Sequence, residues 1–175
     1  MKILAFAASN SKQSINKELA RYAAELLEDA SVEVLDLNDY ELPLFSVDKE
    51  AELGQPELAK AFLAKIAESD ALIISFAEHN GTYSAAYKNL FDWCSRINKK
   101  LYQQKDMVLL ATSPGPGGAA RVLDIAKTSA PHFDGVVKAS LSIPSFHSNF
   151  DVELGRIKNT EINEQLLNAV QTLLD

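Results

Sequence analysis

Three short polar stretches hold most of the groups in this chain that could bind or transform a ligand. They are SNSKQSIN at residues 9–16, AEHNGTYS at 77–84 and SPGPGG at 113–118. Hydroxyls and amides dominate the first stretch, the second mixes a carboxylate, an imidazole and an amide, and the third is nearly free of side chains. None of them forms an evident acid–base pair, so we predict a binding site without a catalytic side chain.

The first stretch is suited to holding a phosphate. Ser9, Ser11 and Ser14 supply hydroxyl donors, Asn16 supplies an amide, and a helix is expected to begin here. The first N–H groups of a helix are unpaired and carry partial positive charge, which favours an anion. Serine is also a favoured helix cap, so capping alone is the competing explanation. The stretch lacks G-x-G-x-x-G, and G-K-[ST] occurs nowhere, so neither a dinucleotide fingerprint nor a Walker A loop is present.

The second and third stretches suit the polar edge and the face of a planar heterocycle. Glu78, His79 and Asn80 offer three kinds of polar group, and Gly81 allows an unusual backbone turn. Around Pro114, the glycines of the third stretch would let backbone amides approach a ligand closely. Ordinary turns explain both stretches equally well, because Asn-Gly and Pro-Gly are strong turn signals.

Other chemistries find no support in the sequence. There is no G-x-S-x-G nucleophile motif, and His79, His132 and His147 are not spaced as metal ligands. The single cysteine, Cys94, excludes an internal disulfide and a cysteine-based zinc site, and we expect it to be a packed thiol. We therefore predict no metal.

Composition limits the class of protein and its partners. The chain has 175 residues, 47% of them apolar and 23% charged, which predicts one globular domain over residues 1–175. Its net charge is −7, from 17 basic and 24 acidic residues, which disfavours nucleic acid or an anionic membrane as partner. No apolar run reaches the length of a membrane span, and the N-terminus does not resemble a signal peptide, so we expect a cytoplasmic protein.

The polar stretches alternate with elements that would bring them together. Apolar runs predict strands over residues 2–8, 31–37, 71–76, 106–112 and 135–143, and helical periodicity follows each of them. The predicted helices cover residues 15–27, 56–69, 84–97, 118–128 and 161–174, and residues 38–55 are expected to be an irregular connection. This α/β order predicts a parallel sheet with helices on both faces, and ligands bind such sheets at the carboxyl ends of the strands. All three polar stretches would lie at that edge.

With these stretches identified, the chain resembles the NAD(P)H-dependent FMN reductase family over nearly its whole length. The family's G-S-x-R-x-x-S-x-N motif is similar to residues 8–16, and its L-P-L-[YF] segment to residues 42–45. Its P-E-Y-N and K-N-x-x-D-W motifs are similar to residues 77–80 and 88–93, and its S-P-G-x-x-G-G loop to residues 113–118. The chain departs from the family at Ala8 (glycine), Ser11 (arginine), Ala77 (proline) and His79 (tyrosine), and Lys12 is available to replace the missing arginine.

The resemblance implies a flavodoxin-like three-layer sandwich with strand order 2-1-3-4-5 and a bound FMN. By resemblance, the first stretch would hold the FMN phosphate, the second would line the flavin and ribityl chain, and the third would border the ring. The residues implied to bind the cofactor are Ser9, Ser11, Ser14, Ile15, Asn16, Glu78, His79, Asn80, Gly81, Ser113, Pro114, Gly115, Gly117 and Gly118.

The same resemblance implies an oxidoreductase that takes hydride from the co-substrate NAD(P)H onto FMN. Electrons would then pass to a small-molecule acceptor such as a quinone, an azo compound or free flavin. It also implies a homodimer or homotetramer. We predict that residues 88–96 form the contact surface, with Trp93 as its anchor. The alternative is a non-catalytic flavodoxin-like electron carrier or ligand-sensing module.

Overall fold

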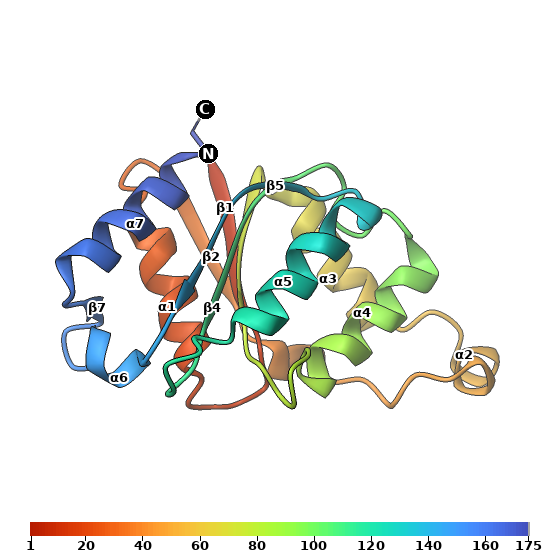
Figure 1. The fold of residues 1–175 in the computed structure, drawn as a ribbon. Helices are drawn as coiled ribbons and strands as arrows, with labels where there is room; N and C mark the ends of the chain where they lie inside the picture. Colours follow the sequence, from red (N-terminus) through yellow and green to blue (C-terminus); the bar gives the residue numbers. More distant parts are fainter. Residues whose placement is uncertain (175) are drawn as a thin grey trace.

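The computed structural model describes residues 1–174, and it is built on one sheet of five parallel strands (Figure 1). The predicted domain end at residue 175 lies outside the described residues. The spatial order of the strands is β2-β1-β3-β4-β5, which confirms the predicted flavodoxin-like order. The strands are β1 (Lys2–Ala8), β2 (Ser31–Leu35), β3 (Ala71–Phe76), β4 (Asp106–Thr112) and β5 (Val136–Ile143).

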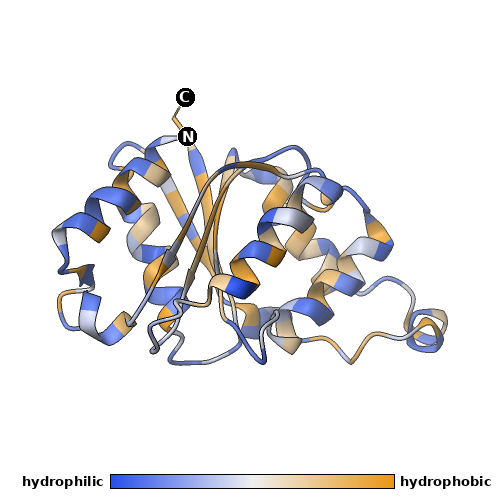
Figure 2. Ribbon diagram, viewed as in Figure 1, coloured by the Kyte–Doolittle hydropathy of each residue, from blue (hydrophilic) through white to orange (hydrophobic). Residues whose placement is uncertain are grey.

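Helices cover both faces of the sheet, as the continuous apolar strands require. Helices α1 (Ile15–Glu25) and α7 (Thr160–Gln171) cover one face. The other face is covered by α3 (Glu57–Glu68), α4 (Ala85–Ile97) and α5 (Ala120–Ser129). Successive strand residues point to opposite faces, so Ile3 belongs to the first core and Leu4 to the second. Figure 2 shows the apolar strands between helices whose outer surfaces are polar.

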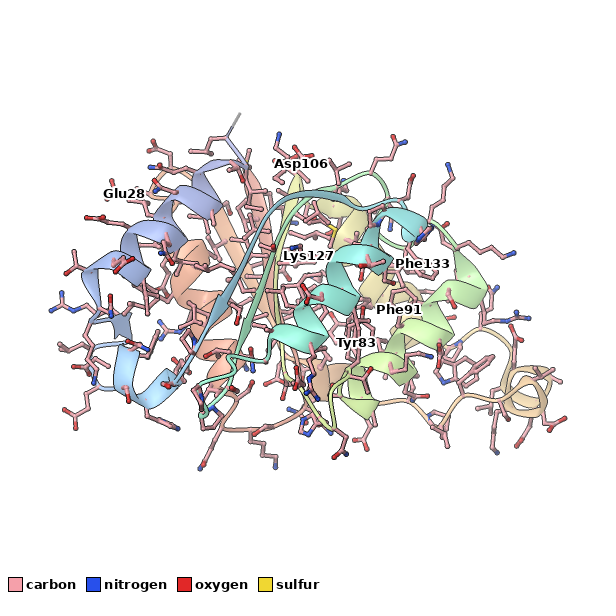
Figure 3. All side chains as sticks on the ribbon, viewed as in Figure 1. Glu28, Tyr83, Phe91, Asp106, Lys127 and Phe133 are labelled. Carbon is pink, nitrogen blue, oxygen red and sulfur yellow. The ribbon has the colours of Figure 1, made fainter. Side chains whose placement is uncertain are left out.

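Aromatic side chains fill the space between α4 and α5. Figure 3 shows Tyr83, Phe91 and Phe133 there, and the rings of Phe91 and Phe133 meet edge to face with centroids 4.6 Å apart. Beneath them, the buried hydroxyls of Tyr87 and Tyr102 lie 2.6 Å apart. Burial raises the pKa of both phenols, so both stay protonated and this pair is a structural contact.

The segment predicted to be irregular contains two helices. Strand β2 ends at Leu35 because the Asp36 carboxylate accepts a hydrogen bond from the Asn38 N–H and starts a 3₁₀ turn, η1 (Leu37–Tyr40). Helix α2 (Val47–Leu53) follows, capped by Ser46. It buries none of its residues and stands away from the sheet as an arm (Figure 1). A helix shows a periodic apolar pattern when it buries one of its faces. Because α2 buries no face in this structure, its sequence has no such pattern and the helix was not predicted.

The chain after α5 also holds small elements that the sequence did not predict. They are η2 (Ala130–Phe133), α6 (Phe146–Asn149) and a two-stranded antiparallel ladder of β6 (Phe150–Asp151) and β7 (Arg156–Ile157). The bounds of the predicted strands and helices are correct to within three residues at every end. None of the described helices combines the length and apolarity needed to cross a membrane.

Candidate functional site

The three polar stretches meet in one open pocket at the carboxyl ends of β1, β3 and β4, at the lower edge of the sheet in Figure 1. The pocket has a volume of about 270 Å³. It brings together many of the residues predicted from sequence and adds Gln13, Ala77 and Thr112, which were not predicted. The predicted residues that line it are Ser9, Ser11, Ser14, Ile15, Asn16, Glu78, His79, Ser113 and Pro114.

Three serines offer free hydroxyl protons at this pocket. Each hydroxyl oxygen accepts from a backbone N–H further along the chain: Ser9 from Ser11 at 3.2 Å, Ser11 from Gln13 at 3.3 Å, and Ser14 from Lys17 at 3.2 Å. Within residues 1–174 none of the three donates a hydrogen bond. Capping and anion binding are therefore compatible, because the cap uses the oxygen and leaves the proton for a ligand.

The start of α1 adds backbone donors to these hydroxyls. The N–H groups of Ile15 and Asn16 have no acceptor among the described residues, as expected for a first helical turn. Lys12 is exposed and forms no ion pair within that part of the chain, whereas Lys17 is paired with Asp36. Several hydrogen-bond donors, a helix N-terminus and one unpaired cation form a donor set that fits a phosphate monoester.

The Asn16 side chain has a different role from the one expected. It is 97% buried, and its Oδ1 accepts from the Ser75 hydroxyl at 2.7 Å and from the Thr112 N–H at 3.1 Å. Its Nδ2 donates to the Thr112 carbonyl at 3.2 Å. The amide thus joins α1 to β3 and β4 beneath the pocket, and the only donor atom of Asn16 without an acceptor among the described residues is its backbone N–H.

Glu78 also differs from expectation, because its carboxylate caps a helix. Helix α5 begins after Ala119, which has no polar side chain, and the Val122 N–H instead donates to Glu78 Oε2 at 3.0 Å. A carboxylate at a helix N-terminus is favourable because it opposes the macrodipole. Glu78 therefore fixes the second stretch to α5 and helps to shape the pocket wall.

His79 to Thr82 form a tight two-residue hairpin turn. The backbones of His79 and Thr82 exchange two hydrogen bonds of 3.0 and 3.2 Å, and both central residues have positive φ, 52° at Asn80 and 80° at Gly81. This is the conformation that Asn-Gly favours. His79 and Asn80 are both exposed, but His79 lines the pocket whereas Asn80 and Gly81 do not. The Arg121 side chain lies beside Gly81.

The glycines of the third stretch serve two different purposes. A Cβ on Gly115 or Gly117 would meet nothing within 4 Å, and neither N–H has an acceptor among the described residues. Gly118, with φ of +59°, instead packs on β5, where a Cβ would lie 2.4 Å from Ser142 Oγ. The first two glycines therefore leave open space and unpaired donors next to the pocket, although none of the three lines it, and the third holds the loop against the sheet.

Two residues of the K-N-x-x-D-W motif on α4 hold the backbone of residues 42–45 by hydrogen bonds. Asn89 accepts from the Phe45 N–H at 2.8 Å and donates to the carbonyls of Leu42 and Pro43, each at 3.1 Å. One turn later, Trp93 donates to the Pro43 carbonyl at 2.8 Å and is only 1% exposed. The prediction that Trp93 anchors a contact between subunits is therefore wrong, because its ring is already covered by this chain.

Two remaining expectations concern cysteine and metal. Cys94 is buried, and burial raises the pKa of its thiol to about 12, so it is a packed and unreactive group as predicted. Within residues 1–174, no cluster of three or more His, Cys, Asp or Glu side chains could hold a metal ion.

Comparisons with known proteins agree with this geometry. A family model described as NADPH-dependent FMN reductase matches residues 1–148. A 2-hydroxy-1,4-benzoquinone reductase of Burkholderia sp is 28% identical over 177 residues, covering 100% of this chain and 93% of that protein. An NAD(P)H-dependent FMN reductase of Pseudomonas aeruginosa is 29% identical, covering 98% of this chain and 94% of that protein.

Among solved structures, the flavoenzyme NAD(P)H:(acceptor) oxidoreductase of Paracoccus denitrificans has a similar fold. It superimposes with a TM-score of 0.78 at 24% identity, covering 99% of this chain and 95% of that one. Because the two sequences are only 24% identical, this superposition shows that the two proteins share a fold.

Proposed function

Since the chain belongs to the NADPH-dependent FMN reductase family and is an FMN-dependent NAD(P)H oxidoreductase, we propose that its carboxyl-edge pocket is the FMN site. The observation that carries this assignment is the set of unused donors. Three serine hydroxyls and the first N–H groups of α1 converge where the polar stretches meet. That set suits a phosphate monoester better than a carboxylate or a neutral group, because many donors can each bond one of its oxygens.

We assign the phosphate to Ser9, Ser11 and Ser14 and to the N–H groups of Ile15 and Asn16. The positive end of α1 and the unpaired Lys12 offset the phosphate charge. This charge compensation explains how a chain without the family's arginine at position 11 can still hold the anion. Asn16 and Glu78 act indirectly: the first fixes the start of α1, and the second fixes the loop beside it.

We assign the ring edge to the other two stretches. The N–H groups of Gly115 and Gly117 can donate to negative charge at the ring edge, and His79, Asn80 and Gly81 form the facing rim. Ser113, Pro114 and the packed Gly118 keep this loop in place. Bound FMN supplies the chemistry, because it accepts hydride from NAD(P)H and passes electrons on. The protein's own task is to orient the cofactor, which agrees with the lack of an acid–base pair.

We propose that the electron acceptor is a quinone, an azo compound or free flavin. The quinone and flavin reductases among the relatives support this choice. We also propose that residues 1–175 act as one flavin-binding domain in the cytoplasm. The single, buried cysteine suits a reducing compartment.

We also propose that the protein forms a homodimer or homotetramer. The pocket volume of about 270 Å³ is at the lower limit for small-molecule sites, so a second copy would supply further walls for a large planar ring. The arm around α2 exposes Leu44, Val47 and Leu53, which are 81%, 69% and 50% exposed. Such a group of apolar side chains is typical of a contact surface. Sedimentation of the wild type and of Leu44→Asp would test it, since the charged variant should sediment as a smaller species.

The central test is spectroscopic. FMN is added to the purified protein, its visible spectrum is recorded, and NADH or NADPH is then added without oxygen. Micromolar binding followed by rapid bleaching supports the reductase. Binding without bleaching by either nucleotide would instead indicate an electron carrier. Failure to bind FMN at micromolar concentration would reject both redox functions and leave a sensing role.

A further inference from the structure

A second cavity lies beside the proposed FMN site and has no role in the function described so far. It has a volume of about 290 Å³ and lies between residues 37–44 and the first turn of α4. The two cavities flank the first polar stretch, because Asn10 lines this cleft while its neighbours Ser9 and Ser11 line the FMN site. A ligand in the cleft would therefore sit next to bound FMN.

The lining of the cleft suits a planar, uncharged heterocycle with polar edges. Tyr40 and Leu37 supply aromatic and apolar surface, and Asn10 and Asn38 supply carboxamides. The Asn10 side chain forms no hydrogen bond within the described residues, so its donor and its acceptor are both free. A carboxamide can bond adenine in two places at once, giving one hydrogen bond and accepting another. Adenine is thus a good chemical match.

The charges around the cleft oppose a phosphate. Glu41 is the only carboxylate in the lining, which contains no lysine, arginine or histidine. The nearby Lys17 is already paired with Asp36, which also accepts from the Asn38 backbone and side chain. In dinucleotide sites, a carboxylate bonds the free 2′-hydroxyl of NADH, whereas a cation accommodates the 2′-phosphate of NADPH.

Building on the proposed function, we propose that this cleft binds the adenosine half of the nicotinamide nucleotide and that Glu41 selects NADH over NADPH. The nicotinamide then extends past Asn10 toward the flavin pocket. The selection works by repulsion, since a 2′-phosphate would bring a dianion against a carboxylate with no free cation in the lining.

The first experiment measures binding without any redox step. Calorimetric titration on the FMN-loaded protein compares 5′-AMP with 2′,5′-ADP, which differs from it only by the added 2′-phosphate. We expect 5′-AMP to bind about tenfold more tightly, which corresponds to one moderate like-charge contact near the surface. Glu41→Lys should abolish or reverse that ratio. Glu28→Lys is the matched control, because it makes the same charge change at the opposite edge of the molecule (Figure 3) and should leave the ratio unchanged.

Several results would overturn the proposal. Equal affinity for the two nucleotides, no binding of either, or an equal effect of Glu28→Lys would each show that Glu41 makes no local contact. Ala86→Phe, which fills the cleft from α4, should raise the KM for NADH at least tenfold while leaving the FMN affinity unchanged. If it instead raises only the KM for the quinone, the cleft holds the electron acceptor and the proposal is wrong. Failure of the FMN site itself appears separately, as loss of FMN binding in the wild type.

Discussion

The side chain of Asn16 pairs with the backbone of Thr112 in both directions, accepting from its N–H at 3.1 Å and donating to its carbonyl at 3.2 Å. The Asn16 carboxamide thus makes the two hydrogen bonds that the backbone of a neighbouring strand would make with Thr112, the last residue of β4. Since Asn16 is the second residue of α1, this contact fixes the position of the helix N-terminus relative to two of the loops that form the pocket.

Replacing Asn16 should affect the whole site and not the phosphate alone. Asn16→Ala leaves the Thr112 N–H, the Thr112 carbonyl and the Ser75 hydroxyl without their buried partner. We expect a loss of about 3 kcal/mol or more in the free energy of unfolding, measured by urea denaturation. Affinities for FMN and riboflavin should fall by similar factors. A loss confined to FMN would show that the side chain contacts the phosphate directly.

Replacing Ser14, unlike replacing Asn16, should weaken the binding of FMN far more than that of riboflavin. Ser14→Ala removes a cap worth about 1 kcal/mol and a hydroxyl donor to the phosphate. Because a hydrogen bond to a charged group contributes about 1.5–3 kcal/mol, FMN affinity should fall by about ten- to a hundredfold. Riboflavin, which lacks the phosphate, should be affected much less; fluorescence titration measures both.

Ser46→Ala is the matched control for Ser14→Ala, because Ser46 caps α2 in the same way. Its hydroxyl oxygen accepts a hydrogen bond from the backbone N–H three residues later, at 3.0 Å. Its ratio of FMN to riboflavin affinity should equal that of the wild type. A similar drop in both variants would assign the effect to helix capping in general.

Glu78 should prove structural and not a proton donor. Glu78→Ala removes the acceptor for the Val122 N–H, and we expect the free energy of unfolding to fall by about 1–2 kcal/mol. Glu78→Gln keeps an acceptor oxygen and should restore most of that stability. The pH profile of kcat should be unchanged in the glutamine variant, and a displaced profile would contradict the capping role.

Substituting alanine for the two kinds of glycine in the third stretch should have different effects on stability. Gly118→Ala places a Cβ against Ser142 and Ile143 at a positive φ, and we expect a destabilisation of about 2 kcal/mol or more. Thermal unfolding should register this as a drop of several degrees. Gly117→Ala, beside open space, should leave the melting temperature nearly unchanged and can act only on ligand binding.

The ion pair of Lys17 and Asp36 should make stability depend on pH in the acid range. The hydrogen bond from Lys17 lowers the pKa of Asp36 to about 2, below its value of about 4 in the unfolded chain. Its stabilising contribution is therefore fully present above about pH 4 and is lost as pH falls toward 2. Because the pair is about one-third exposed, we expect less than about 1 kcal/mol. Asp36→Asn should remove this part of the acid dependence in urea titrations from pH 2 to 6, whereas Asp39→Asn should not.

Much of the fold could be predicted because its signals are local. The apolar runs of β1, β3 and β4 are nearly completely buried, and such runs occur in parallel sheets covered on both faces. The meeting of the three polar stretches followed from that topology. Helix α2 could not be predicted in this way, because it buries no side chain and leaves no periodic apolar pattern.

The sequence by itself determined the strands, their succession along the chain and the edge of the sheet at which the three polar stretches meet, because hydrophobic periodicity and turn residues act over a few neighbouring positions. Only the tertiary structure decided which polar side chains line the pocket and which are bonded within the protein. Asn16, Glu78, Asn89 and Trp93 belong to motifs that resemble binding residues, yet each bonds backbone groups at least 40 residues away in the chain. Such partners are set by the packing of the whole sheet and its helices, and a buried polar group must find them wherever the fold brings them.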